Sequence, residues 1–101
     1  VTMDKPTPAE TFLEALAPEV QEAVKELAQA LNKEGALSIR DKTVIALACA
    51  VAIRCQDCAE RHAKLAYQAG ASQEELSEAA AIASLVRMGS GLNTASTILK
   101  D

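Results

Sequence analysis

Residues 38–62, SIRDKTVIALACAVAIRCQDCAERH, decide the fold of this chain. Ser38, with the acidic Asp41 three positions on, is typical of a helix N-cap. Residues 44–53 are apolar on every side of the helix that follows, which predicts a position at the centre of a helical bundle. This run is far shorter than the roughly 20 residues that cross a bilayer, so no membrane partner is expected.

Helix signals continue before this segment. Residues 7–10, TPAE, are typical of a capping box with proline at the first helical position, and they predict a short helix through about residue 16. A second helix is predicted from Pro18, because apolar residues recur at spacings of three and four along one face. Gly35 is expected to stop it.

Helix signals also continue after this segment. A helix through about residue 69 is expected to end at Gly70, and residues 72–75, SQEE, predict another capping box. Residues 88–91, MGSG, are expected to break or kink the helix that follows, and residues 92–100 predict a last, weaker helix. Strand signals are almost absent. The sequence therefore predicts an all-α chain, a single compact bundle of about five or six helices that forms one domain over residues 1–101.

The composition limits both the core and the partners. Half of the 101 residues are apolar, but only Phe12 and Tyr67 are aromatic, so the core is expected to consist of thin, closely packed, alanine-rich helices. Such a core buries little surface within one subunit, and a homo-oligomer would bury more. The formal net charge is −4 and the basic residues are scattered, which argues against a nucleic-acid partner.

The cysteine count and the start of the sequence indicate a compartment. No basic segment followed by an apolar run opens the sequence, so a signal peptide is not expected. Three cysteines are an odd number and too few for a secreted disulfide scaffold. We therefore expect a reducing, cytoplasmic location, where a close cysteine pair is typically redox-active or metal-binding.

The pattern Cys55-x-x-Cys58-x-x-x-His62 carries the candidate chemistry. Positions three and four apart lie on one face of a helix, so these three side chains are expected to converge. A helix N-terminus favours the thiolate, which is the nucleophile of thiol chemistry. Cys58 is then the candidate nucleophile, and His62 is its general base and later proton donor. Cys55 is the thiol that resolves a sulfenic acid to a disulfide and exchanges with an external reductant.

Other interpretations of this motif stay open. Zinc takes two cysteines and a histidine as ligands, but it needs a fourth ligand, which a carboxylate or another subunit would have to supply. A c-type haem is disfavoured, because its histidine directly follows the second cysteine. Two inert helical thiols are the third interpretation. Cys49 lies among alanine and valine and is predicted to be a small buried hydrophobe.

The segment of residues 37–76, LSIRDKTVIALACAVAIRCQDCAERHAKLAYQAGASQEEL, resembles the core of the alkylhydroperoxidase AhpD / carboxymuconolactone decarboxylase-like family. The shared features are a Leu-Ser start, an alanine-rich apolar helix, the C-x-x-C-x-x-x-H motif and an Ala-Gly-Ala helix end, and the similarity covers roughly residues 37–90. The resemblance implies an all-helical fold, trimers or hexamers, and peroxidase activity. It further implies that Cys58 carries the sulfenic acid, that Cys55 is proton donor and disulfide partner, and that His62 relays protons.

Two positions depart from the family pattern. The proton relay usually includes a glutamate twelve residues before the first cysteine, where this chain has Thr43. Asp41, Glu60 or a carboxylate of another helix would have to replace it. Asp57 stands before the second cysteine, where small relatives often have tyrosine, and its negative charge disfavours a neighbouring thiolate. Weak peroxidase activity, or another substrate, is the expected consequence.

Residues and resemblance together predict a thiol-dependent peroxidase, an oxidoreductase with peroxide as acceptor. A dithiol, such as a lipoyl or thioredoxin-like protein, is expected to reduce the resulting Cys55–Cys58 disulfide. No organic cofactor is expected, because the chain has no glycine-rich phosphate loop. The alternatives are a non-catalytic redox sensor, a disulfide reductase, a metal-binding protein and a decarboxylase-like lyase.

Overall fold

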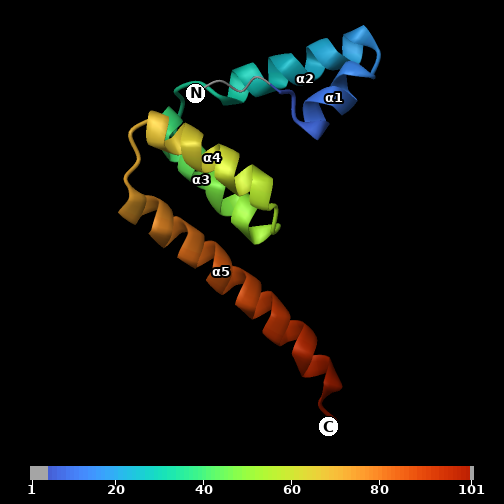
Figure 1. Ribbon diagram of the computed structural model, residues 1–101. Helices are drawn as coiled ribbons and strands as arrows, with labels where there is room; N and C mark the ends of the chain where they lie inside the picture. Colours follow the sequence, from blue (N-terminus) through green and yellow to red (C-terminus); the bar gives the residue numbers. More distant parts are fainter. Residues whose placement is uncertain (1–4, 101) are drawn as a thin grey trace. The chain divides into compact units, whose positions relative to one another are not determined.

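The computed structural model describes residues 5–100, and these residues form helices connected by short turns (Figure 1). The elements are α1 (Pro8–Glu14), α2 (Pro18–Leu31), α3 (Ile39–Ala52), α4 (Gln56–Gln68), α5 (Gln73–Ala95) and the short 3-10 helix η1 (Ser96–Ile98). No strand occurs in residues 5–100, so the all-α prediction is confirmed. The chain divides into two compact units, Val1–Lys33 and Glu34–Asp101. That residues 1–101 form one domain stays a prediction.

Side-chain hydrogen bonds satisfy backbone groups at both ends of α1 in the first unit. The predicted capping box is present: the hydroxyl of Thr7 accepts a hydrogen bond from the Glu10 amide at 3.1 Å, and the Glu10 carboxylate accepts one from the Thr7 amide at 2.8 Å. Gln21 of α2 donates its side-chain amide to the carbonyls of Glu14, at 3.2 Å, and Leu16, at 2.7 Å. These bonds satisfy carbonyls that the end of α1 leaves without helical partners.

The second unit contains the core and the cysteine motif. Helices α3 and α4 lie antiparallel and side by side (Figure 1), and α5 packs chiefly against α3, with only a small contact to α4. One apolar cluster joins the three helices and the turn before α5, and its buried members are Leu47, Ala66, Ala71 and Leu76. Ala66 has no exposed surface, which shows how closely the alanine-rich helices approach. No helix in residues 5–100 is long and apolar enough to cross a membrane.

Helix α3 is less enclosed than its uniformly apolar sequence predicts. Leu47 and Ala50 are buried, but Ile45 is 46% exposed and Ile53 is 71% exposed. Cys49 is also exposed, so the prediction of a buried Cys49 is wrong. The physical reason is the number of neighbours: α4 and α5 cover only part of the circumference of α3, and sequence periodicity does not report how many helices surround a helix.

Helix α5 runs without interruption through the segment that was expected to break it. Gly89 and Gly91 lie within its 23 residues, so the predicted break at residues 88–91 is wrong, and only residues 96–98 form the separate last turn. A glycine inside a helix costs about 1 kcal/mol but leaves every backbone hydrogen bond available. The same helix exposes a row of large apolar side chains: Ile82, Leu85, Val86, Met88 and Leu92.

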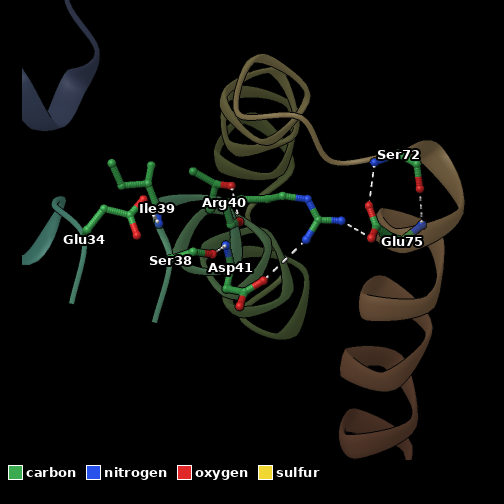
Figure 2. Close-up of polar contacts among 8 residues, drawn as sticks. Glu34, Ser38, Ile39, Arg40, Asp41, Ser72 and Glu75 are labelled. Carbon is green, nitrogen blue, oxygen red and sulfur yellow. Dashed lines mark hydrogen bonds and ion pairs between the residues drawn. The ribbon is translucent and has the colours of Figure 1, made fainter. Parts of the chain in front are cut away.

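An ion pair connects the beginnings of α3 and α5 (Figure 2). One guanidinium nitrogen of Arg40 pairs with Oε2 of Glu75, and the other lies 3.4 Å from Asp41 Oδ1. Glu75 also completes a capping box, because its Oε1 accepts the Ser72 amide at 2.8 Å while the Ser72 hydroxyl accepts the Glu75 amide at 3.1 Å. One carboxylate thus both begins α5 and attaches it to α3.

This double role predicts different effects for two substitutions of Glu75. Glu75→Gln keeps an acceptor for the Ser72 amide but loses the charge, and it is expected to reduce the free energy of unfolding by less than about 1 kcal/mol, as exposed ion pairs do. Glu75→Ala also removes the acceptor of the Ser72 amide, which adds about 1 kcal/mol, while the bond from the residue 75 amide to the Ser72 hydroxyl stays. Urea unfolding at low and high salt measures both effects. Arg40→Gln is the control, because it removes the ion pair and keeps the cap. If Glu75→Gln and Arg40→Gln together destabilise by the sum of their separate effects, the two side chains are not coupled.

Candidate functional site

A left-handed residue ends α3 immediately before the cysteine motif. Arg54 has φ 62°, in the region that favours glycine. Its amide donates to the Val51 carbonyl at 3.0 Å, and the amide of Cys55 donates to the Ala50 carbonyl, also at 3.0 Å. These two bonds make a Schellman motif, which satisfies the last carbonyls of the helix and turns the chain sharply. The turn fixes the backbone of Cys55 against the end of α3.

The end of α4 repeats this motif with glycine in place of arginine. Gly70 has φ 98°, its amide donates to the Tyr67 carbonyl at 3.0 Å, and the Ala71 amide donates to the Ala66 carbonyl at 2.9 Å. Glycine takes this conformation without the steric penalty of a Cβ atom. Arginine does not, because a left-handed L-residue costs roughly 1–2 kcal/mol. The chain therefore keeps a less favourable residue at the turn beside its cysteines.

Cys55 is the N-cap of α4. Its Sγ accepts a hydrogen bond from the Cys58 amide at 3.2 Å, in the way that a serine or aspartate oxygen caps other helices. Cys55 and Cys58 form a disulfide, with their Cα atoms 5.2 Å apart. Both residues are half-buried. The structure thus brings the two predicted thiols together at the N-terminus of α4, where the helix dipole favours negative charge on sulfur.

His62 lies on α4 one helical turn after Cys58 and is half-buried. Residues four apart share a helix face, so the imidazole belongs to the same side of α4 as Cys58. No hydrogen bond or ion pair to His62 occurs within the part of the chain that the structure describes. The proton-relay role of His62 stays a prediction.

Thr43, at the position of the relay glutamate, and the two carboxylates considered as its substitutes, Asp41 and Glu60, have other partners. The hydroxyl of Thr43 donates to the Arg40 carbonyl at 2.6 Å, within its own helix. Asp41 lies beside Arg40, and Glu60 accepts a bond from the Gln56 side chain at 3.5 Å. None of the three side chains contacts His62 through a hydrogen bond or an ion pair in residues 5–100.

A shallow pocket of about 160 Å³ opens beside Cys55. It is lined by the end of α3, the turn and the beginning of α4, with the residues Ala50, Val51, Arg54, Cys55, Gln56 and Ala59. Cys58 and His62 do not line it, so the pocket reaches the disulfide from the Cys55 side. The place of Arg54 in this pocket was not predicted from the sequence. Arg54-Cys55 follows α3 as Gly70-Ala71 follows α4, but arginine, unlike glycine, does not mark such a turn by its residue type.

A zinc site at the cysteine motif requires a fourth ligand beside the two cysteines and the histidine. Within residues 5–100, no three side chains of histidine, cysteine, aspartate or glutamate lie together in a group that could hold a metal ion. A zinc site at this motif would therefore need donors from outside the described chain.

Comparisons with known proteins agree with the helical core. The model of a family described as the carboxymuconolactone decarboxylase family matches residues 18–101. A crystal structure of a protein from Methanobacterium thermoautotrophicum, a structural genomics target, is 50% identical in sequence and superimposes with a TM-score of 0.78. That match covers 88% of this chain and 99% of the other. No curated protein matches the chain.

Proposed function

Because the chain belongs to the carboxymuconolactone decarboxylase family and carries a cysteine pair at a helix N-terminus, we propose that it is a thiol-dependent peroxidase. The observation that carries the proposal is the position of the pair: Cys55 caps α4, and Cys58 lies in its first turn. This position favours the thiolate form, and disulfide formation needs no movement of distant elements.

The first half of the proposed cycle consumes peroxide. The Cys58 thiolate attacks one oxygen of a hydroperoxide, the O–O bond breaks, and Cys58 becomes a sulfenic acid. The leaving alkoxide takes a proton, which His62 supplies. The Cys55 thiol then attacks the sulfenic sulfur, so that the disulfide forms and water leaves.

The second half returns the two electrons. A dithiol attacks the disulfide, forms a mixed disulfide, and leaves as its own cyclic disulfide while both protein thiols are restored. A lipoyl or thioredoxin-like protein has the required chemistry, in a cytoplasmic compartment that keeps dithiols reduced. We also propose a homo-oligomer, a trimer or hexamer. The exposed apolar row on α5 supports it, because contiguous apolar surface of this kind typically marks an interaction face.

Mass spectrometry of fully reduced protein mixed with one equivalent of an organic hydroperoxide tests the proposal. The expected result is rapid loss of two hydrogens per chain, with the new disulfide mapped to Cys55 and Cys58. The exposed thiol of Cys49 should stay free and is the internal control. If both motif thiols are still reduced after several minutes, the peroxidase proposal is wrong.

A disulfide reductase without peroxidase activity is the second candidate. It is favoured by Thr43, whose hydroxyl is bonded to its own helix and supplies no carboxylate to the histidine. The two candidates are distinguished by the oxidant. A reductase would transfer electrons from a dithiol to a small disulfide, and it would leave hydroperoxide unchanged under the same conditions.

A further inference from the structure

The pocket beside Cys55 is lined by both apolar and polar side chains. Ala50 is only 2% exposed, and together with Val51 and Ala59 it gives the pocket an apolar floor. The exposed side chains at the pocket are Arg54 and Gln56. Arg54 makes no ion pair within residues 5–100, so its guanidinium has no acidic partner in the described chain.

The disulfide presents only one of its sulfurs to this pocket. Cys55 lines the pocket and Cys58 does not. The hydrogen bond from the Cys58 amide to Cys55 Sγ withdraws electron density from that sulfur, and the N-terminus of α4 adds positive potential. A thiolate that enters the pocket therefore meets the more electrophilic sulfur, in a pocket whose lining includes Arg54, which has no ion-pair partner in residues 5–100.

The choice of residue at the turn supports a role for that charge. The twin motif at Gly70 shows that glycine suits this conformation, and arginine at φ 62° is less favourable. A positive side chain after the end of α3 interacts favourably with the helix dipole, by about 0.3–1 kcal/mol, which offsets only part of the roughly 1–2 kcal/mol that the left-handed backbone costs. The acidic residues nearby, Asp57 and Glu60, do not line the pocket.

We propose that Arg54 is a specificity-determining residue for the reductant: it selects dithiols that also carry an anionic group. The inference rests on the proposed redox cycle at the Cys55–Cys58 pair. In the step concerned, a reductant thiolate attacks Cys55 Sγ, the S–S bond breaks, and Cys58 leaves as a thiolate. The second reductant thiol, after losing its proton to solvent, displaces Cys55 from the mixed disulfide, so the dithiol is oxidised and the protein reduced.

Dihydrolipoate and dihydrolipoamide provide a matched pair of probes. They share one dithiol and differ only in a carboxylate or a neutral amide at the end of the chain. Oxidised protein, prepared with a thiol oxidant such as diamide, is mixed with each probe, quenched with alkylating agent and counted for free thiols by mass spectrometry. Cys49 adds one label to every sample.

At low ionic strength the wild-type protein is expected to react about five-fold faster with dihydrolipoate than with dihydrolipoamide. This ratio of the two rates corresponds to the attraction of a unit charge pair about 4 Å apart in water. The ratio should approach one at 0.5–1 M salt, because the Debye length is then only about 3 Å. Arg54→Gly should bring the ratio close to one at low salt, and Arg54→Lys should preserve most of it.

Two control variants separate this role from net charge and from turn stability. Lys64→Gln removes one positive charge from an exposed residue of α4 that does not line the pocket, and the ratio should not change. Gly70→Arg places arginine in the twin turn, where a Cβ atom meets nothing within 4 Å, so it tests the cost of the conformation alone. It should lower stability and leave the ratio unchanged.

Three outcomes would overturn the inference: an unchanged ratio in Arg54→Gly, an equal loss in Lys64→Gln, or a disulfide that neither probe reduces. The experiment contains no peroxide. A charge preference that depends on Arg54 therefore remains valid even if hydroperoxide fails to oxidise the protein. The absence of such a preference, in turn, would not contradict the peroxidase proposal.

Discussion

Replacement of Cys58 by serine is expected to reduce peroxidase turnover by at least about 10³-fold, the scale on which loss of a catalytic nucleophile acts. A serine hydroxyl at this position is not ionised near neutral pH and does not attack peroxide. Steady-state peroxide consumption with dihydrolipoamide measures the loss.

Cys55→Ser should stop turnover equally but leave the first chemical step. One equivalent of hydroperoxide should then produce a sulfenic acid on Cys58, which dimedone traps and peptide mass spectrometry locates. Cys49→Ser is the matched control, because Cys49 is an exposed free thiol outside the disulfide, and this variant should retain wild-type activity. Trapping of the sulfenic acid on Cys55 in the Cys58→Ser variant would reverse the assigned roles.

Leu47→Ala is expected to produce the largest loss of stability. Leu47 is 5% exposed and is the α3 member of the cluster that joins α3, α4 and α5. Removal of three carbons from such a site leaves a cavity and typically costs 2–5 kcal/mol, and we expect about 3 kcal/mol. For a chain of this size the thermal midpoint should then fall by roughly 12–20 °C.

Leu99→Ala provides the comparison for this core substitution. Leu99 is 74% exposed and follows the last helical turn. Its truncation should change the free energy of unfolding by less than about 0.5 kcal/mol. Thermal unfolding followed by circular dichroism measures both variants. Equal effects of the two substitutions would contradict the described core.

Local chemistry in the sequence predicted the helix starts well. The capping residues Thr7, Ser38 and Ser72 each begin a helix where they were expected to, because an N-cap depends on a hydroxyl and an amide only three residues away. The C-terminal ends were harder to predict. Gly70 signals its turn by residue type, whereas Arg54 adopts the same backbone without any such signal.

Burial could not be predicted from the sequence to the same degree. The apolar residues of α3 suggested a fully enclosed helix, yet Ile53 and Cys49 are exposed. Exposure depends on how many helices pack around a position, which is a property of tertiary structure. The break expected at Gly89 and Gly91 is absent for a related reason. Helix propensity is a weak preference, and the rest of a long helix overrides it.

The candidate site was predictable to the extent that it is local. Spacing alone placed Cys55, Cys58 and His62 at the start of one helix, and the structure has them there. The pocket was not predictable in this way, because it needs the angle between α3 and α4 that the Arg54 turn creates. The roles of the three side chains in catalysis stay predictions that the cysteine variants test.

The main chain of Cys55 belongs to two helices at once: its amide donates to the Ala50 carbonyl at the end of α3, and its carbonyl accepts the Ala59 amide in the first turn of α4. Its Cα is therefore held from both sides, and the only soft coordinate left to the sulfur is rotation about the Cα–Cβ bond. Opening and closing of the disulfide then amount to a change of rotamer on a stationary main chain. Such rotations take picoseconds to nanoseconds for accessible side chains. Reorganisation of the protein should not limit the rate of thiol exchange at this site, and the encounter with the reductant should.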